Sequence, residues 1–454
     1  NVFSGCPYNS SVYEGCMILI SDEKVTISRI SDISAINIVT IPIFEEPRKI
    51  VYQQDLGVFG LLTIRAESQA IRNEHFQKPQ NQRPYSLRLT DEINVDLKSN
   101  CQIDVSCFQI INQETFEPLY VHSFPFFEIA SSLACYSCKP QSLFVVGTEL
   151  ITEIGEEPSS GRIVLYQFCD NSLTLVTECS TKGSVKCIDV HKEFIICCVT
   201  HSLLIFVLRP DDNLLCLHNF SNHVTSMYVK CMDDTIIVGD LIRSLAIYKI
   251  IEDGEINLVA KSSNIDWLTA VEVVDKDNYL YSNMEGCLCI ATNPTDSPIR
   301  NELLNLEVSL AFNLDQHVNV FKKGSLNSNN IHSKNIKNTK SILFGTISGM
   351  IGVMMDLPPS WLTVLQQIQS VMIKRLHSAG NIDYCQWRNA YSEKFKLDSK
   401  GMIDGDVLDG FISQFRPYLK EILEPIEDGF ESNTSIETKM DQVTSYINDL
   451  MHCH

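Results

Sequence analysis

Few residues of this chain have the types and spacing that metal binding requires. One C-x-x-C motif is present, Cys135-Tyr136-Ser137-Cys138, but no second pair follows at zinc-ribbon distance. A closed zinc site needs four ligands, so we interpret these two as strand cysteines. The final residues, His452-Cys453-His454, could bind metal adventitiously, and we interpret them as the end of the last helix.

The segment Met402-Ile403-Asp404-Gly405-Asp406 begins like a calcium loop, but Val407 and Leu408 follow where an EF-hand loop needs further ligands. We therefore interpret Asp404 as a helix cap. The motifs G-x-S-x-G, H-E-x-x-H, G-x-x-x-x-G-K-[ST] and G-x-G-x-x-G, which mark common hydrolases, metalloproteases and nucleotide-binding proteins, do not occur in the sequence. We predict a protein that is not an enzyme and that uses no cofactor or metal.

The amino-acid composition limits which partners and which cellular compartments are expected. The 454 residues include 36 Lys and Arg against 56 Asp and Glu, which gives a net charge of −20. Such a chain repels the phosphate backbone unless its charges are strongly segregated, so a basic nucleic-acid-binding surface is excluded as the dominant feature. The 17 cysteines are scattered through apolar segments, which favours a reducing compartment, the nucleus or the cytoplasm.

The termini and the apolar runs bear on targeting and membranes. The chain begins with Asn1 and shows no signal peptide, so we expect it to start inside a longer protein. Its longest apolar run, residues 194–208, is interrupted by polar residues and is too short for a membrane helix, which needs about 20 residues. We predict two buried strands there, and no membrane contact.

Short β-branched and aromatic runs punctuated by Gly, Asn, Asp and Ser extend from Cys16 to about Met355 and predict a mostly β fold. A phrase of three apolar residues, Gly, a polar turn and a second apolar strand recurs. Its clearest copies are residues 143–168, 235–250 and 341–354. A period of about 40 to 50 residues with four strands per unit is typical of a β-propeller.

The units predict a seven-bladed, WD40-like propeller over residues 1–356, although the Gly-His and Trp-Asp dipeptides of WD40 repeats are missing. The N-terminal strands around 16–29 would close the ring with the last blade. A pair of β-sandwiches is the alternative. Two polar insertions, residues 66–103 and 322–340, are predicted to be solvated loops.

The pattern becomes helical after Leu357-Pro358-Pro359, which predicts a small C-terminal α-helical domain over residues 357–454. Ser360 is the expected N-cap of its first helix. Apolar stripes at helical spacing predict three helices. These stripes are, in order, Trp361, Leu365, Ile368, Met372 and Leu376; then Ile403, Val407, Phe411 and Phe415; then Val443, Ile447 and Leu450.

The propeller pattern also predicts where a partner would bind. The start of each inner strand and the turn between the second and third strands of each blade lie at the same face of a propeller. Residues predicted at that face combine Tyr, Trp and Arg with Leu and Ile, a mixture typical of binding hot spots. They are Tyr228, Leu241, Arg243, Trp267, residues 317–319 and Ile347. Tyr228 and Trp267 could instead be core residues.

Longer segments of the sequence carry a family resemblance. Residues 358–395, with paired tryptophans at Trp361 and Trp387, and residues 401–411 resemble the large subunit of damaged-DNA-binding protein, the adaptor of cullin-4 RING ubiquitin ligases. Residues 44–53 and 113–124 match the same family, and the resemblance covers essentially the whole chain. It implies the third propeller and the C-terminal helical domain of that family.

The resemblance implies partners as well. In that family the first and third propellers grip an amphipathic helix of WD40-type substrate-receptor proteins, and the cullin docks on a middle propeller that this chain does not resemble. Nucleic acid contact would be indirect. The family's receptor contacts correspond to Met227, Tyr228, Leu241, Arg243, Trp267, Asn319, Val320 and Ile347. His317 stands where the family usually has an aromatic residue.

The family therefore implies a non-enzymatic scaffold acting in DNA damage repair and protein ubiquitination, located in the nucleus and also the cytoplasm. Two alternatives stay open. The large subunits of the cleavage and polyadenylation specificity factor and of the U-two-associated splicing factor share the propeller, so the protein could serve pre-mRNA processing. A propeller enzyme would instead need a ring of His, Asp or Glu around the central channel.

Overall fold

The structure is a computed structural model that divides into two compact units. One unit comprises Ile41–Gly324 and Lys340–Asp404, and the other comprises Asn1–Thr40, Ser325–Thr339 and Gly405–His454. The described residues are 2–8, 16–21, 25–29, 40–68, 102–138, 141–151, 158–221, 223–250, 256–293, 304–324, 340–375, 384, 388, 400–408, 423 and 435–451.

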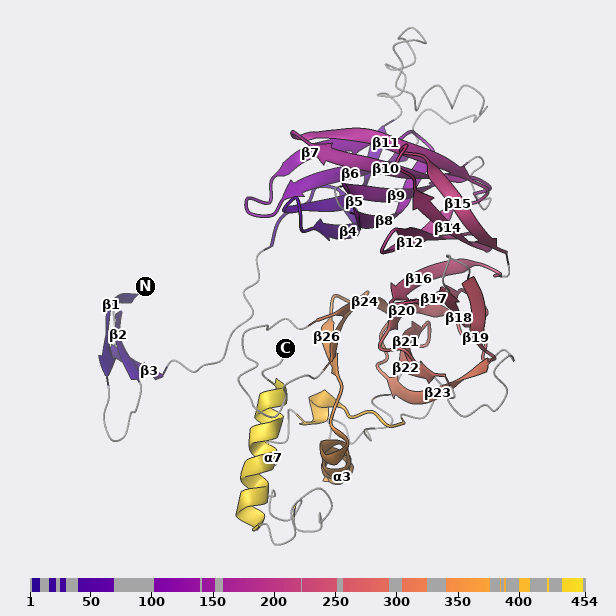
Figure 1. Cartoon of the computed structure of the whole chain (residues 1–454). Coiled ribbons are helices and arrows are strands. Elements are labelled where there is room, and N and C mark those ends of the chain that lie inside the picture. Colours follow the sequence, from indigo (N-terminus) through magenta and orange to yellow (C-terminus); the bar gives the residue numbers. More distant parts are fainter. Residues whose placement is uncertain are drawn as a thin grey trace. The chain divides into compact units, whose positions relative to one another are not determined.

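Among the described residues, six antiparallel blades form most of the larger unit (Figure 1). Each blade is a meander in which strands adjacent in sequence pair. Blades 1 to 3 comprise β4 (Glu46–Gln53), β5 (Val58–Ser68), β6 (Gln102–Asn112) and β7 (Pro118–Ser123); β8 (Glu128–Cys138), β9 (Gln141–Leu150), β10 (Gly161–Cys169) and β11 (Ser172–Thr181); β12 (Val185–His191), β13 (Phe194–Val199), β14 (Ser202–Leu208) and β15 (Leu214–Phe220).

Blades 4 to 6 continue the same order and include the last strands of the propeller. They comprise β16 (Ser226–Met232), β17 (Thr235–Asp240), β18 (Ser244–Ile250) and β19 (Ile256–Ser262); β20 (Leu268–Val273), β21 (Asn278–Asn283), β22 (Cys287–Thr292) and β23 (Leu304–Asn313); β24 (Val318–Lys323), β25 (Ser341–Thr346) and β26 (Ile351–Met355). Blade 6 has three strands among the described residues.

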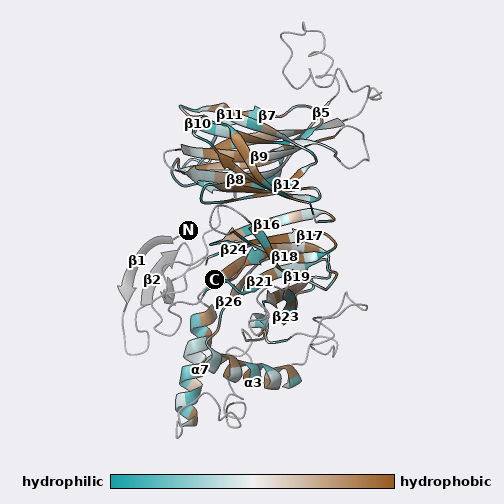
Figure 2. Cartoon of the chain, turned by 45° about the vertical axis from the view of Figure 1, so that its right-hand side comes forward, coloured by the Kyte–Doolittle hydropathy of each residue, from teal (hydrophilic) through white to brown (hydrophobic). Residues whose placement is uncertain are grey.

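The blades are arranged as in a propeller. The first strand of each blade contacts the first strand of the next, from β4 through β8, β12, β16 and β20 to β24, so these are the inner strands. The apolar cores lie between successive blades, and Figure 2 shows the apolar strands inside them. This arrangement confirms the predicted mostly β, propeller-like fold, and β13 and β14 confirm the two buried strands predicted in residues 194–208.

Packing between blades explains the glycine of the repeated phrase. A Cβ at Gly239, in β17 of blade 4, would lie 3.0 Å from Val271 and 3.2 Å from Leu268 of β20 in the next blade. Gly147 of β9 meets Val185 and Ile188 of β12 in the same way. The second strand therefore needs a residue without a side chain where the next inner strand crosses it.

A β-bulge lies near the beginning of every inner strand. The register shifts at Arg48, Ser131, Lys186, Met227, Thr269 and Asn319, so one residue of each inner strand is left without a partner. We call this end of the ring, where the inner strands begin and where the turns between second and third strands lie, the entry face. A bulge re-aims side chains, and here it does so at the entry face of all six blades.

Blades 4 and 5 are joined by a strand pairing that spans both. The N-terminal part of β23 pairs in parallel with β19, from Ala260 opposite Leu304 to Ser262 opposite Leu306. The C-terminal part of β23 pairs antiparallel with β22 of its own blade. The two blades thus form one eight-stranded sheet, which ties them together by main-chain hydrogen bonds.

The helix α3 (Pro359–Arg375) follows blade 6 and buries Leu365, Ile368 and Met372, which confirms the predicted stripe at these positions. The prediction of Ser360 as its N-cap is wrong, because the helix begins at Pro359 and the carbonyl of Pro358 accepts the first N–H bonds, from Trp361 and Leu362. Proline suits the first helical position since it lacks the N–H group that would otherwise be unsatisfied.

The segment after α3 packs on the edge of blade 5. Lys400 pairs with Ala311 of β23 through N···O distances of 2.8 and 3.1 Å. Asp404 follows, and its backbone N–H donates to the side-chain oxygen of Gln369 in α3 at 2.7 Å. The residue is a buried carboxylate directly before the helical residues 405–408, in agreement with its predicted place at a helix start.

The other unit contains a three-stranded antiparallel sheet of β1 (Val2–Tyr8), β2 (Cys16–Ser21) and β3 (Val25–Arg29). It also contains α7 (Ile436–Met451), whose buried Val443 and Ile447 confirm the last predicted stripe. Ser435 caps α7, since its hydroxyl accepts the N–H of Thr438. Phe411, Phe415, Trp387 and most of both predicted insertions lie outside the described residues.

Candidate protein-docking surface

The structure brings the predicted docking residues to the entry face of blades 4, 5 and 6. Trp267 precedes β20 and is 54% exposed, so it is not the core residue that the sequence left possible. Ile347, in the turn after β25, is 67% exposed. Arg243, Val320 and Asn319 are also exposed, whereas Leu241, Met227 and Tyr228 are partly buried. Tyr228 packs against the core between blades 4 and 5, as the alternative interpretation foresaw.

The same hydrogen bond positions one residue in each of these three blades. The N–H of Leu241 donates to the carbonyl of Thr225 at 2.8 Å, that of Met284 to Trp267 at 2.8 Å, and that of Ile347 to His317 at 3.0 Å. Each bond joins the turn after a second strand to the loop before the inner strand of the same blade. Leu241, Met284 and Ile347 are therefore structurally equivalent, and all three are apolar.

Asp240 fixes the turn that carries Arg243. Its carboxylate accepts the backbone N–H groups of Ile242 and Arg243 at 2.9 Å and that of Val224 at 2.6 Å. The ring of His223 lies beside it, with Nδ1 3.7 Å from Oδ2. Burial alone would raise the pKa of Asp240, but these contacts outweigh burial and hold the pKa below its ordinary value. The turn is thus built around a buried carboxylate.

Met227 and Asn319 share a structural position, because each is the bulged residue of its inner strand. Thr269 is the bulged residue of blade 5, between them. A bulge releases one residue from the strand ladder near the start of each inner strand. The two residues that the family resemblance selected therefore occupy equivalent positions on blades 4 and 6.

Three exposed residues of this face were missed by the sequence interpretation. Met284 is half exposed, Ile242 is exposed beside Leu241, and Ile265 precedes β20 and is 76% exposed. Met284 was missed because its blade has Ser282 where other copies of the phrase have glycine. The available signal was Asn283, whose side-chain oxygen accepts the N–H groups of Glu285 and Cys287 and so forms the turn as Asp240 does in blade 4.

We call the exposed or partly exposed set on blades 4 to 6 the apolar arc. It consists of Leu241, Ile242, Ile265, Trp267, Met284, Val320 and Ile347. Monomeric proteins seldom expose a large contiguous apolar surface without a binding role. The arc therefore offers apolar contact area, and Arg243, His317 and Asn319 are exposed at the entry face of the same blades.

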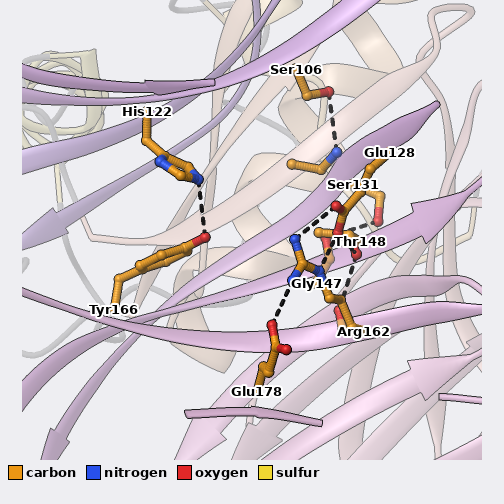
Figure 3. A network of polar contacts seen from close by, with 10 residues as sticks. Ser106, His122, Glu128, Ser131, Gly147, Thr148, Arg162, Tyr166 and Glu178 are labelled. Atoms are coloured by element: carbon orange, nitrogen blue, oxygen red, sulfur yellow. Dashed lines mark hydrogen bonds and ion pairs between the residues drawn. The ribbon is translucent and has the colours of Figure 1, made fainter. Parts of the chain in front are cut away.

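The entry face of blade 2 is polar instead. Glu128 is buried there and accepts hydrogen bonds from Arg162, with Nε 2.6 Å from Oε1, and from the hydroxyl of Thr148 at 2.7 Å (Figure 3). Arg162 also pairs with Glu178. Glu149, the equivalent of Leu241, pairs with Lys186 of blade 3 at 2.7 Å. These charges satisfy one another, so blade 2 presents paired charges at the face where blades 4 to 6 expose apolar side chains.

Titratable side chains on the inner strands also neutralise one another. Asp189, Lys230, Glu272 and Lys323 alternate in sign on β12, β16, β20 and β24. Burial would lower the pKa of Lys230, but Asp189 and Glu272 outweigh it and raise that pKa. Among the described residues no group of three or more His, Cys, Asp or Glu is arranged to hold a metal ion. Cys135, the first cysteine of the C-x-x-C motif, is a free and partly buried thiol.

None of the helices in the described part of the chain is both long and apolar enough to cross a membrane.

The fold and this surface define a class, a β-propeller that exposes an apolar arc at one face. Among known families, the model of the CPSF A subunit region matches residues 105–413 of this chain. The chain belongs to this family, and the resemblance predicted from the sequence is confirmed.

The chain is also similar in sequence to individual proteins of known name. The chain is 26% identical to DNA damage-binding protein 1 of Drosophila melanogaster over 466 residues, covering 99% of this chain and 40% of the relative. It is 29% identical to DNA damage-binding protein 1b of Arabidopsis thaliana over 430 residues, covering 92% of this chain and 36% of the relative. The chain thus spans about two fifths of the length of the curated relatives that it matches.

Proposed function

We propose that this chain is the receptor-docking part of a non-enzymatic scaffold, an adaptor of a cullin-RING ubiquitin ligase that acts in DNA damage repair. The observation that carries the proposal is the apolar arc, formed by equivalent positions on three consecutive blades. The relatives named DNA damage-binding protein 1 support the repair context. The cullin would bind a propeller outside the region that this chain matches.

The occupant that suits the apolar arc is an amphipathic helix of a receptor protein. A helix presents its apolar residues as a stripe, and the arc supplies apolar side chains from adjoining turns. In this proposal Trp267 and Arg243 are the main contacts, Leu241, Val320 and Ile347 provide apolar area, and Met227, Tyr228 and Asn319 complete the rim nearest the inner strands. Trp and Arg are the residues most often found at binding hot spots.

The net charge of −20 supports an indirect relation to nucleic acid. An acidic scaffold repels the phosphate backbone, so DNA would be contacted by a separate receptor. The scaffold would act in the nucleus and also in the cytoplasm, where its free cysteines stay reduced.

Seven blades and a C-terminal helical domain belong to the same proposal. In a closed ring the first and last blades are covered by a neighbouring blade, yet Ile50 of β4, in blade 1, is 61% exposed, and Ile351 of β26, the third strand of blade 6, is 68% exposed. Gly345, the equivalent of Gly239, has only Val320 of its own blade near its Cβ position among the described residues. We infer that β1–β3, itself an antiparallel meander, fills this place as the seventh blade.

Deleting residues 1–29 should therefore lower the thermal unfolding midpoint of the protein, because the apolar surfaces of blades 1 and 6 would lose their cover. Differential scanning calorimetry measures this directly. An unchanged midpoint would contradict closure of the ring by these strands.

The family name also supports a second candidate, a scaffold subunit in pre-mRNA 3′-end processing or splicing. Affinity purification of the full-length protein followed by mass spectrometry separates the two. The proposal predicts recovery of a cullin together with WD40-type receptor proteins. Recovery of polyadenylation or splicing subunits without a cullin would replace it by the second candidate.

A further inference from the structure

Two carboxylates adjoin the most exposed part of the apolar arc. Asp266 directly precedes Trp267, and Glu285 directly follows Met284. The hydrogen bond from the N–H of Met284 to the carbonyl of Trp267, at 2.8 Å, joins the two loops on which they lie. Both carboxylates therefore belong to the entry face of blade 5.

Hydrogen bonds hold both acidic residues, Asp266 through its carboxylate and Glu285 through its backbone N–H group. The hydroxyl of Tyr281 donates to Oδ2 of Asp266 at 3.3 Å. The N–H of Glu285 donates to the side-chain oxygen of Asn283 at 3.2 Å, and the turn closes at Gly286 with a φ of 75°. A side chain at Gly286 would place its Cβ 2.8 Å from the backbone nitrogen of Gln316, so the turn needs glycine there.

The charges of these two groups are not neutralised within the described part of the chain. No Lys, Arg or His there lies within ion-pair distance of Asp266 or Glu285. Burial raises the pKa of Glu285, and the negative charge of Asp266 raises it further. A cation from a partner would stabilise both negative charges.

We propose, on the basis of the proposed function, that Asp266 and Glu285 select receptor helices that carry a lysine or arginine beside their apolar stripe. The apolar side chains of such a helix would cover Ile265, Trp267 and Met284 while its basic group lies between the two carboxylates. The exposed Trp267 ring next to them adds a cation–π contact. Arg243 on the neighbouring blade has the opposite sign, so the arc distinguishes the two ends or sides of a helix by charge.

A displayed library of amphipathic helices tests this inference. The library keeps one apolar stripe and randomises the flanking positions, and it is selected against the full-length protein and against the double variant Asp266→Asn/Glu285→Gln. The control variant Asp233→Asn/Asp234→Asn removes the same charge from the turn between β16 and β17, at the opposite end of the ring. Circular dichroism verifies that all variants are folded.

Selection against the natural protein should enrich Lys or Arg at a flanking position, and the enrichment should disappear in the double variant and persist in the control. The affinity of a selected basic helix should fall about fivefold or more in the double variant. This difference in affinity should be smaller at high salt, which screens the charges. Helices that bind in a Trp267-dependent way without basic enrichment would overturn this inference alone. If no selected helix depends on Trp267, the docking surface itself is wrong.

Discussion

Replacing Trp267 with alanine should weaken the binding of a receptor helix to the full-length protein by about 2 kcal/mol, roughly thirtyfold. The side chain is 54% exposed in the structure and lies in the middle of the apolar arc, so a bound helix would bury it. Loss of a buried aromatic anchor removes its contact area and leaves the partner's apolar groups uncovered. Isothermal titration calorimetry with a co-purified receptor measures the change.

The natural comparison is Leu175→Ala. Leu175 is also 54% exposed, but it lies on β11, the outer strand of blade 2, away from the apolar arc. Its replacement should leave the affinity unchanged.

Arg243→Ala should weaken the binding free energy of the receptor helix by more than about 1 kcal/mol, because the turn that carries Arg243 is fixed by Asp240. Unchanged binding in both the Trp267 and the Arg243 variants, with the fold intact, would refute the docking assignment.

Arg388→Ala should lower the free energy of unfolding of the larger unit by about 3 kcal/mol. Arg388 Nε lies 2.7 Å from Asp404 Oδ2, and a second guanidinium nitrogen lies 2.8 Å from Oδ1. Asp404 is only 2% exposed. The variant would remove the guanidinium from a buried carboxylate, which would keep the hydrogen bond from the hydroxyl of Tyr384.

Arg388 also lies over the ring of Phe312 in β23, 5.5 Å from its centre, so it anchors the segment after α3 to blade 5. Lys192→Ala is the matched control, since Lys192 pairs with Asp234 at 3.4 Å while both side chains are more than half exposed. That change should cost less than about 1 kcal/mol. Equal effects of the two changes in chemical denaturation would show that the buried pair has no special role.

Local sequence signals predicted the strands of this fold well. The turn residues within 194–208 and the glycines at 147, 239 and 345 identify the second and third strands of four blades. Gly147 and Gly239 are required by contacts with the inner strand of the next blade, about 30 to 40 residues later in the chain. The glycine of the repeated phrase is therefore a local sequence signal of the packing between blades.

Features that depend on distant residues could not be predicted in the same way. The parallel pairing of β19 with β23 crosses two blades and has no local signature. Asp404 was expected only as a helix cap, because its partners Arg388 and Tyr384 are 16 and 20 residues away and belong to no motif. Met284 and Ile265 were missed since exposure of a single apolar side chain depends on neighbouring loops, and Ser282 stands in blade 5 where other copies of the phrase have glycine.

Hydrogen–deuterium exchange of the full-length protein, with and without a bound receptor, tests the central claim most directly. We predict slower exchange in residues 241–243, 263–267, 284–286 and 347–349, the loops that form the entry face of blades 4 to 6. The turns at the opposite end, residues 233–234 and 275–277, should be unchanged. Protection confined to those opposite turns, or receptor binding that leaves the entry face unprotected, would contradict the account.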